Sequence, residues 1–351
     1  MVFPVILDSY FLILCYMVRI AINGFGRIGR LFFRQAFGQQ DFEIAAINDL
    51  GDVANLAYLL QYDSVYRQYA TSVEAKNNML VVAGREVRMM QEPEPAKLPW
   101  KDLGIDIVVE STGFFTTDEA ASAHLAAGAR HVVITAPAKG SQVTTALVGT
   151  NDDRFRTAHS ITSNASCTTN SVAPVLAILL EQFGIDRANM VTVHGYTASQ
   201  KLVDGPDAKD FRRGRAAAEN IIPTSTGAAE AVIDAIPELT GRFVADAVRV
   251  PVLTGSLSMV TALVERPTTA TEVQDLFRQQ ARDARWSKVL AVAEDPVVSS
   301  DIIGVPFGAV VDIGLIAVLG GTMVKVFSWY DNEAGYTATL LEHVRSVIKH
   351  L

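Results

Sequence analysis

Two side chains of this sequence have the types and the order needed for covalent catalysis by a thiol. Cys167 lies within residues 163–170, which read SNASCTTN, immediately before an apolar helical stretch. A helix N-terminus stabilises negative charge, which favours the reactive thiolate form of a cysteine placed there. His194 follows at the end of the strand-like run Met190–Val193 and is a candidate general base. The pair predicts a cysteine nucleophile assisted by an imidazole.

A less specific interpretation of the same two residues must be set beside this one. A single cysteine is more often a small buried hydrophobe, and a single histidine is more often a packed or surface residue. The polar neighbours of Cys167 and the helix start weigh against the first alternative. Gly195, Tyr196 and Thr197 form a polar strand end after His194, where site residues often project. Spacing alone leaves both interpretations open.

A glycine pattern near the start of the chain predicts a dinucleotide site. Residues 23–29 read NGFGRIG and place Gly24, Gly26 and Gly29 after an apolar strand and at the start of a helix. Such glycines allow a tight turn, close approach of the pyrophosphate and close helix packing, and the helix N-terminus donates N–H groups to the phosphates. Asp49 closes the second strand, where a carboxylate bonds the adenosine ribose and repels a 2′-phosphate. NAD is therefore favoured over NADP.

The first half of the chain alternates short apolar strands with helices, a pattern typical of βαβ units. Runs that are apolar on both faces fit a buried parallel sheet. The predicted strands are Val18–Ile22, Phe42–Asn48, Ile105–Glu110 and His131–Thr135, and the predicted helices are Leu31–Phe37 and Asp118–Ala127.

The second half differs, because its strands are longer and meander. The predicted elements are a helix at Thr168–Phe183, a long polar loop at 198–220, strands at Phe243–Val250 and Ser256–Glu265, a helix at Thr271–Ala284, a hairpin of Leu315–Leu319 with Met323–Tyr330 around Gly320 and Gly321, and a helix at Gly335–Lys349. The expected fold is α/β, a Rossmann-type parallel-sheet NAD domain (17–166 and 331–351) plus an α+β catalytic domain with a mostly antiparallel sheet (167–330).

Bulk composition narrows the functional classes. The 351 residues carry a net charge of −8, which argues against nucleic-acid binding, although Arg212, Arg213 and Arg215 form a local basic cluster. Two cysteines exclude a disulfide scaffold and indicate a reducing compartment, and the scattered histidines predict no metal site. Residues 1–16 are apolar but too short to span a membrane, and they lack a signal-peptide pattern. They are interpreted as a non-native extension, with a true anchor or targeting segment as the alternative.

Nearly all of residues 17–351 resemble phosphorylating glyceraldehyde-3-phosphate dehydrogenases. The resemblance rests on residues 22–30 (INGFGRIGR), 163–170 (SNASCTTN), 329–333 (WYDNE) and on matching runs within 212–229. It implies NAD-dependent oxidation of glyceraldehyde 3-phosphate to 1,3-bisphosphoglycerate through a cysteine thioester. A cytoplasmic homotetramer working in glycolysis is implied as well, with a small phosphorylated aldehyde and inorganic phosphate as partners and no membrane or nucleic acid.

The resemblance also assigns roles to individual residues. Cys167 would attack the aldehyde and His194 would take the hydroxyl proton, and a thiolate–imidazolium pair would depress the pKa of Cys167. Two phosphate sites are implied, one with Thr197 and Arg249 and the other with Ser166, Thr168, Arg213, Thr226 and Gly227. Arginine forks and hydroxyls suit phosphate oxygens. Taken alone, Arg249 could equally be a structural arginine with an acidic partner.

For the cofactor, the resemblance places Arg27 and Ile28 at the pyrophosphate turn and Asp49 on the adenosine ribose. Thr135 would lie along the dinucleotide, and Asn332 would lie near the nicotinamide carboxamide. The alternatives are that Thr135 merely ends a strand and that Asn332 merely caps the following helix.

Two other functions stay open at the level of sequence. Erythrose-4-phosphate dehydrogenase is a relative that releases the acyl group to water instead of phosphate. A member of another class, an NAD-binding regulatory protein that has lost catalysis, is the second alternative. Whether NADH formation depends on phosphate distinguishes the phosphorylating enzyme from erythrose-4-phosphate dehydrogenase. The reactivity of Cys167 tests whether the protein has lost catalysis.

Overall fold

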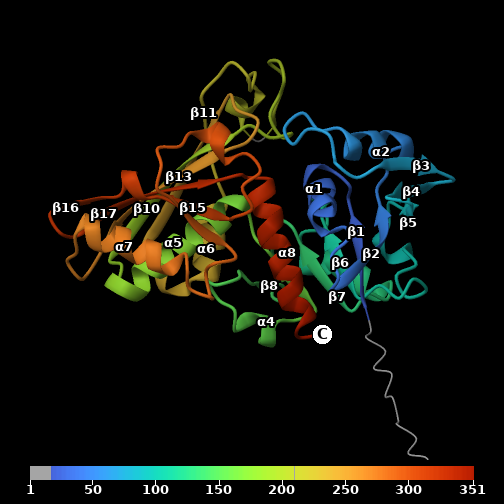
Figure 1. Ribbon diagram of the computed structural model, residues 1–351, viewed down its shortest axis with the longest axis horizontal. Coiled ribbons are helices and arrows are strands. Elements are labelled where there is room, and N and C mark those ends of the chain that lie inside the picture. Colours follow the sequence, from blue (N-terminus) through green and yellow to red (C-terminus); the bar gives the residue numbers. More distant parts are fainter. Residues whose placement is uncertain (1–16, 209) are drawn as a thin grey trace, which may run out of the picture.

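The computed structural model describes residues 17–208 and 210–351, which form two sheets with helices packed on them (Figure 1). The predicted extension at 1–16 lies outside these described residues. Within the described part of the chain, no helix is both long and apolar enough to cross a membrane. The predicted fold class, a parallel-sheet domain followed by a mostly antiparallel one, is confirmed.

The first sheet has nine strands in the order β3-β4-β5-β2-β1-β6-β7-β9-β8. From β5 to β8 all neighbouring strands are parallel, and β3-β4-β5 is an antiparallel extension. Its strands are β1 (Val18–Asn23), β2 (Phe42–Asn48), β3 (Val73–Lys76), β4 (Met79–Val82), β5 (Arg85–Met90), β6 (Ile107–Glu110), β7 (His131–Ile134), β8 (Thr144–Thr145) and β9 (Ile161–Ser163). The order reverses between β1 and β6, which is where such sheets bind nucleotides.

Helices cover this sheet and connect its strands. They are α1 (Arg27–Ala36), α2 (Val53–Gln61), α3 (Asp118–Ala126), the short α4 (Arg154–Thr157) and the C-terminal α8 (Ala334–Ile348). The Asp52 side chain caps α2 and the Thr117 hydroxyl caps α3, because each accepts a hydrogen bond from a first-turn N–H. Helix α8 lies between the two halves of the molecule and packs against α1 and α5 (Figure 1).

The second sheet has the order β11-β12-β10-β13-β17-β15-β14, with β16 paired to β17. Only β10–β12 and β14–β15 are parallel pairs. Its strands are β10 (Arg187–Gly195), β11 (Ile222–Thr224), β12 (Phe243–Val250), β13 (Ser256–Leu263), β14 (Leu290–Ala293), β15 (Ala309–Asp312), β16 (Ala317–Leu319) and β17 (Met323–Tyr330). Its helices are α5 (Cys167–Phe183), α6 (Ala228–Ala235) and α7 (Ala270–Gln280).

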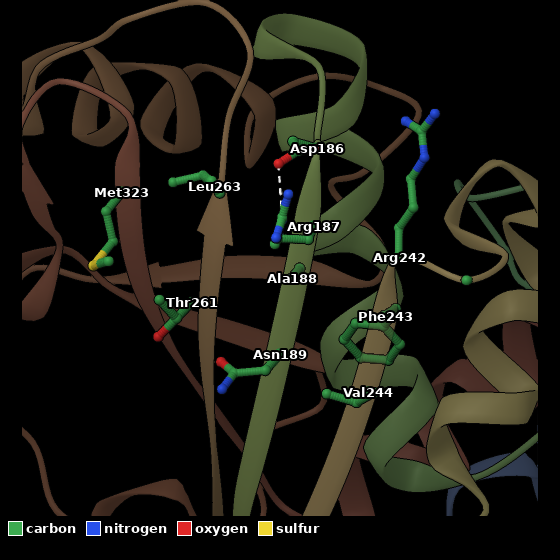
Figure 2. Close-up of a pocket in the computed structure, with 11 residues that line it drawn as sticks. Asp186, Arg187, Ala188, Asn189, Arg242, Phe243, Val244, Thr261, Leu263 and Met323 are labelled. Atoms are coloured by element: carbon green, nitrogen blue, oxygen red, sulfur yellow. Dashed lines mark hydrogen bonds and ion pairs between the residues drawn. The ribbon is translucent and has the colours of Figure 1, made fainter.

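One face of the second sheet is covered by helices and the other is open. Alternate strand residues such as Met190, Phe243 and Val260 join α5 in a buried core. Because successive side chains point to opposite faces of a strand, residues of the other parity face outward. Val244 on that face is 63% exposed and lines a hollow of about 640 Å³ that crosses β10, β12 and β13 (Figure 2).

Helix α1 and the segment 198–220 differ from their predictions. Helix α1 begins at Arg27 instead of Leu31, so Gly29 lies inside it. A Cβ at Gly29 would come 2.1 Å from the Gly24 oxygen, and the glycine is therefore needed for the helix to pack against the preceding turn. Segment 198–220 is not wholly irregular, because it contains a 3₁₀ turn at Phe211–Gly214 and a bridge between Lys201 and Ala216. The hairpin at Gly320 and Gly321 is confirmed, with φ angles of 60° and 78°.

A buried histidine–threonine–histidine chain joins β7, β9 and α8. His343 Nδ1 lies 3.0 Å from the Ala146 oxygen, which only accepts, so Nδ1 carries the proton. His343 Nε2 then accepts from the Thr162 hydroxyl at 2.8 Å, and Thr162 in turn accepts from His131 Nε2 at 3.0 Å. Burial lowers the pKa of His131 to about 4 and that of His343 to about 3. Both rings are therefore neutral in the folded protein.

The two buried histidines predict that the folded protein loses stability in mild acid. Both histidines have a lower pKa folded than unfolded, so their contribution is present above about pH 6.5 and is lost as pH falls toward 4. The unfolding free energy should fall by up to about 1.4 kcal/mol per pH unit for each proton taken up only on unfolding. The unfolding free energy, measured by denaturant titration at several pH values from 8 to 4.5, should depend less steeply on pH for His343→Gln than for the wild type. The control is His159→Gln, because His159 is exposed. The same pH dependence in the wild type and both variants would contradict the prediction.

Candidate active site

Helix α5 and strand β10 bring Cys167 and His194 together. The Ser166 side chain accepts a hydrogen bond from the Thr169 N–H at 3.1 Å, which caps α5 and makes Cys167 its first residue. His194 lies near the end of β10 and is 4% exposed. The Cys167 Sγ and His194 Nε2 atoms are 3.4 Å apart. The sequence interpretation in which the two residues are unrelated is thereby excluded.

The opposite edge of the imidazole is held by backbone and by Arg249. His194 Nδ1 lies 2.6 Å from the Gly195 oxygen, and this carbonyl can only accept. Arg249 Nη1, which only donates, also lies 2.5 Å from Nδ1, so the two contacts favour opposite tautomers. A general base needs the tautomer in which Nδ1 carries the proton and Nε2 faces the thiol as an acceptor. Arg249 stands opposite His194 on the parallel neighbour β12 and donates to the same carbonyl at 3.0 Å.

The pKa directions of this pair differ from the expectation. Burial raises the pKa of the Cys167 thiol, although the Arg249 cation and hydrogen bonds from Thr168 act in the opposite direction. Burial, and to a smaller extent the Arg249 cation, lower the pKa of His194 to about 3. Desolvation therefore outweighs the helix N-terminus, and a neutral thiol faces a neutral imidazole. The predicted depression of the thiol pKa is wrong for the protein alone.

Hydroxyl groups that the sequence interpretation missed surround the pair. Tyr330 at the end of β17 is 1% exposed, and its hydroxyl lies 2.9 Å from Thr168 Oγ1 and 2.7 Å from Thr192 Oγ1. Its ring packs edge-on against His194 at 5.8 Å between centroids. The available signal was strand alternation, because Tyr330 has the same parity as the buried Ser328 of β17.

Arg249 pairs with no acidic side chain among the described residues. No carboxylate lies within ion-pair distance of its guanidinium anywhere in residues 17–208 and 210–351. Burial lowers its pKa, and the Arg213 charge does so too. The alternative of a structural arginine paired with an acid is therefore excluded for the described residues. A half-buried cation without a counter-ion is suited to an anionic ligand.

Apart from Ser166 and Thr168 at the start of α5, the other expected phosphate ligands lie on three segments. Thr197 follows β10, and its hydroxyl contacts Ser199 at 2.9 Å. The Thr226 hydroxyl accepts from the Ala228 N–H at 3.1 Å, and Gly227 caps α6. Arg213 donates to the Thr224 hydroxyl at 2.7 Å and lies 3.8 Å from Asp210. Arg213 is thus already paired.

The glycine turn has the shape that a dinucleotide requires. Gly24 has a φ of 91°, and a Cβ there would come 2.6 Å from the Thr112 nitrogen, so the turn presses against the end of β6. A Cβ at Gly26 would meet nothing within 4 Å, so the surface is open at the glycine expected to admit the pyrophosphate. Asp49 accepts from the Phe25 N–H at 2.6 Å and from the Gly51 N–H at 2.8 Å, which ties this carboxylate to the turn.

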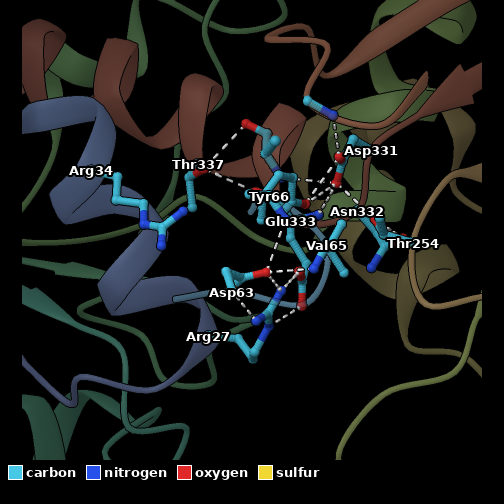
Figure 3. Close-up of polar contacts among 12 residues, drawn as sticks. Arg27, Arg34, Asp63, Val65, Tyr66, Thr254, Asp331, Asn332, Glu333 and Thr337 are labelled. Atoms are coloured by element: carbon cyan, nitrogen blue, oxygen red, sulfur yellow. Dashed lines mark hydrogen bonds and ion pairs between the residues drawn. The ribbon is translucent and has the colours of Figure 1, made fainter. Parts of the chain in front are cut away.

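The remaining cofactor candidates lie around this turn. Ile28 follows Arg27 in the first turn of α1, and Thr135 directly follows β7. The Arg27 guanidinium is committed to ion pairs with Asp63 and Glu333 (Figure 3).

Asn332 lies between β17 and α8, and it is not the cap of that helix. Asp331 accepts the N–H groups of Glu333 and Ala334, each at 2.9 Å, so the capping alternative for Asn332 is wrong.

A parallel sheet with a dinucleotide turn, joined to a thiol–imidazole pair, defines an NAD-dependent dehydrogenase that acts through a cysteine. Two family models match, the NAD-binding domain of glyceraldehyde 3-phosphate dehydrogenase at residues 18–118 and its C-terminal domain at 166–332. The chain belongs to the glyceraldehyde-3-phosphate dehydrogenase family. This confirms the resemblance, NAD as cofactor and NAD-dependent oxidation of glyceraldehyde 3-phosphate as the activity.

Curated relatives match over almost their whole length. The glyceraldehyde-3-phosphate dehydrogenase of Thermotoga maritima is 48% identical over 335 residues, which span 95% of this chain and 100% of the relative. The enzyme of Geobacillus stearothermophilus is 47% identical over 326 residues, or 93% of this chain and 96% of the relative. Glyceraldehyde-3-phosphate dehydrogenase 1 of Bacillus subtilis is 46% identical over 333 residues, or 95% and 98%.

The contact between Arg249 and His194 makes a prediction about proton affinity. Replacing Arg249 by Met removes a cation that disfavours imidazolium, so the pKa of His194 should rise from about 3 toward its usual range. Arg249→Lys keeps a charge and should keep the pKa low. NMR titration of the His194 ring protons measures both variants. Equal values in wild type and Arg249→Met would show that the cation does not act on the ring.

Proposed function

We propose that the chain captures oxidised glyceraldehyde 3-phosphate as a thioester on Cys167 and releases it to inorganic phosphate as 1,3-bisphosphoglycerate. The observation that carries this proposal is the 3.4 Å contact between the Cys167 sulfur and His194 Nε2, beside Arg249, which pairs with no carboxylate among the described residues. The family activity supplies the oxidation step, and these residues account for the covalent steps.

Cys167 and His194 act in sequence on the aldehyde. The sulfur forms a bond to the aldehyde carbon, while His194 Nε2 takes the thiol proton and passes it to the new oxyanion, giving a neutral hemithioacetal. Bound NAD⁺ supplies the hydride acceptor. His194 then takes the hydroxyl proton as the carbon loses hydride, which leaves a thioester on Cys167. Phosphate oxygen attacks the thioester carbon, the carbon–sulfur bond breaks, and the thiol regains a proton.

Two groups of residues are proposed to hold the two phosphates. Arg249 and Thr197 take one of them, and this assignment is supported by the absence of any carboxylate near Arg249 in the described part of the chain. The second site takes Ser166, Thr168, Arg213, Thr226 and Gly227. The α6 start contributes backbone N–H groups next to Thr226, and helix N-termini favour anions.

The cofactor is proposed to lie across the ends of β1 and β6. Gly24, Gly26 and Gly29 shape the turn, and the backbone N–H groups of Arg27 and Ile28 face the pyrophosphate, because the Arg27 side chain is already paired. Asp49 takes the ribose, Thr135 lies along the dinucleotide, and Asn332 faces the carboxamide. We divide the chain into an NAD-binding domain (17–166 and 331–351) and a catalytic domain (167–330).

Phosphate dependence tests this function against the hydrolytic alternative. NADH formation from glyceraldehyde 3-phosphate should require added phosphate, and erythrose 4-phosphate should be the poorer substrate. His194→Gln should lower kcat by roughly 10²–10⁴-fold, because a general base is lost. Cys167→Ala should abolish turnover yet bind NAD, which separates loss of chemistry from loss of fold. Turnover that ignores phosphate would contradict the acyl-phosphate product.

A cytoplasmic homotetramer is proposed as the working form. The open face of the second sheet carries apolar side chains at Val191, Val244, Met259 and Phe327, an outward stripe suited to a second copy of the chain. The exposed Phe211 in the segment 198–220, with 87% of its surface accessible, is a second apolar feature.

Charge placed on the open sheet face should dissociate the assembly. Val244→Asp introduces a carboxylate where apolar side chains would otherwise meet their counterparts, and such burial is unfavourable. Analytical ultracentrifugation should show a tetramer for wild type and smaller species for the variant. Exposed Val298→Asp, which lies outside β10–β13, is the matched control and should remain tetrameric. A monomeric wild type, or an unaffected Val244→Asp, would contradict the assignment of this face.

A further inference from the structure

We propose that Tyr66 and Asp331 are positioning residues for the nicotinamide end of the dinucleotide. Neither residue was singled out by the sequence, and the inference rests on the proposed role of Asn332. The two side chains connect the cofactor turn of the first domain to the segment that carries Asn332 (Figure 3).

Asp331 is the centre of this connection. Its carboxylate is fully buried, and hydrogen bonds reach it from both domains. The donors are the Tyr66 hydroxyl (2.8 and 3.0 Å), the Thr254 hydroxyl (2.7 Å) and the N–H groups of Gly304 (2.8 Å), Glu333 (2.9 Å) and Ala334 (2.9 Å). A buried carboxylate held by this many donors has one orientation, because rotation would leave several of them unpaired.

The orientation of Asp331 is passed to Asn332 by Thr254. The Thr254 hydroxyl contacts both Asp331 Oδ1 and Asn332 Oδ1, the latter at 3.0 Å. Ser256 donates to the same Asn332 oxygen at 2.9 Å. A hydroxyl has one proton, and that of Thr254 goes to the Asp331 carboxylate, so Ser256 is the hydroxyl that can donate to Asn332. The contacts with Thr254 and Ser256 hold this end of the Asn332 amide, and its other end is the one that bonds the nicotinamide carboxamide in this proposal.

Tyr66 extends the connection to the pyrophosphate turn. It lies in the segment after α2, where Asp63 accepts the N–H groups of Val65 at 2.8 Å and Tyr66 at 3.0 Å. Asp63 also pairs with Arg27, the first residue of α1, and the Arg27 guanidinium lies 5.8 Å from the Tyr66 ring centroid.

Arg27 also forms an ion pair with Glu333, which is next to Asn332 in the sequence. The turn that holds the phosphates and the amide that holds the nicotinamide therefore belong to one polar network. The Tyr66 hydroxyl links Asp331 to the segment that follows α2.

Different residues would therefore bind the adenosine and pyrophosphate and orient the nicotinamide. The glycine turn can bind the adenosine and pyrophosphate without Tyr66. Correct placement of the nicotinamide requires the Tyr66–Asp331–Thr254 chain, because this chain orients Asn332.

Tyr66→Phe removes the hydroxyl and keeps the ring. The Kd for NAD should rise roughly tenfold, since a hydrogen bond to a charged group is lost, whereas the Kd for ADP-ribose, which lacks nicotinamide, should stay unchanged. Thr254→Val removes the next link and should give the same selective loss, so the test does not depend on one variant. Calorimetric titration with both ligands, with the thermal midpoint as a check on folding, measures the effect.

Tyr62→Phe is the matched control. Tyr62 directly follows α2, four residues before Tyr66; it is 49% exposed, and its side chain makes only a ring contact with Tyr58 within the described residues. It should bind both ligands as wild type does. Equal weakening of NAD and ADP-ribose by Tyr66→Phe, or no change in either, would overturn the inference. A wild type that binds NAD but forms no NADH would overturn the proposed function instead, and the ratio of the two Kd values would still decide this proposal.

Discussion

The buried start of α5 is the constraint on which the rest of the site depends. Ser166 caps the helix, so Cys167 has a fixed rotation about the helix axis. Successive residues of a helix are rotated by about 100°, so a start shifted by one residue would point the sulfur elsewhere. The helix body is locked in the core of the second sheet by side chains from Val172 to Phe183. The β10–β12 pairing then sets His194 and Arg249 against that fixed sulfur.

Desolvation governs the electrostatics of the site before substrate arrives. Cys167 and His194 are neutral because burial disfavours both charged forms, and Arg249 makes imidazolium still less favourable. An anion bound by Arg249 would offset that positive charge. The proton affinity of His194 would then rise when a phosphorylated substrate is in place, which is when the base must accept a proton. Under the proposed role of Arg249, substrate binding and proton transfer would be coupled.

Local patterns predicted the parts of the fold that local physics determines. The glycine turn, the hairpin at Gly320 and helix α5 each follow from short-range rules. Strands β3–β5 were missed because they are short and half-exposed, without a buried apolar run. The Arg27 pairing with Glu333 and the contact of Tyr330 with Thr192 join distant parts of the chain. The thiol pKa also depends on burial, which is a property of the tertiary structure.

The turn from β17 into α8 has to satisfy both domains at once. It ends the central strand that carries Tyr330 and begins the helix that packs against α1. Asp331 meets the requirement by accepting N–H groups of the helix and hydroxyls from both sides, which leaves Asn332 at the boundary of the two domains. Hydride transfer needs the nicotinamide in one orientation against the thiol-bound carbon. Asn332 is held jointly by both domains and can provide that orientation, because its position depends on how the two domains are aligned.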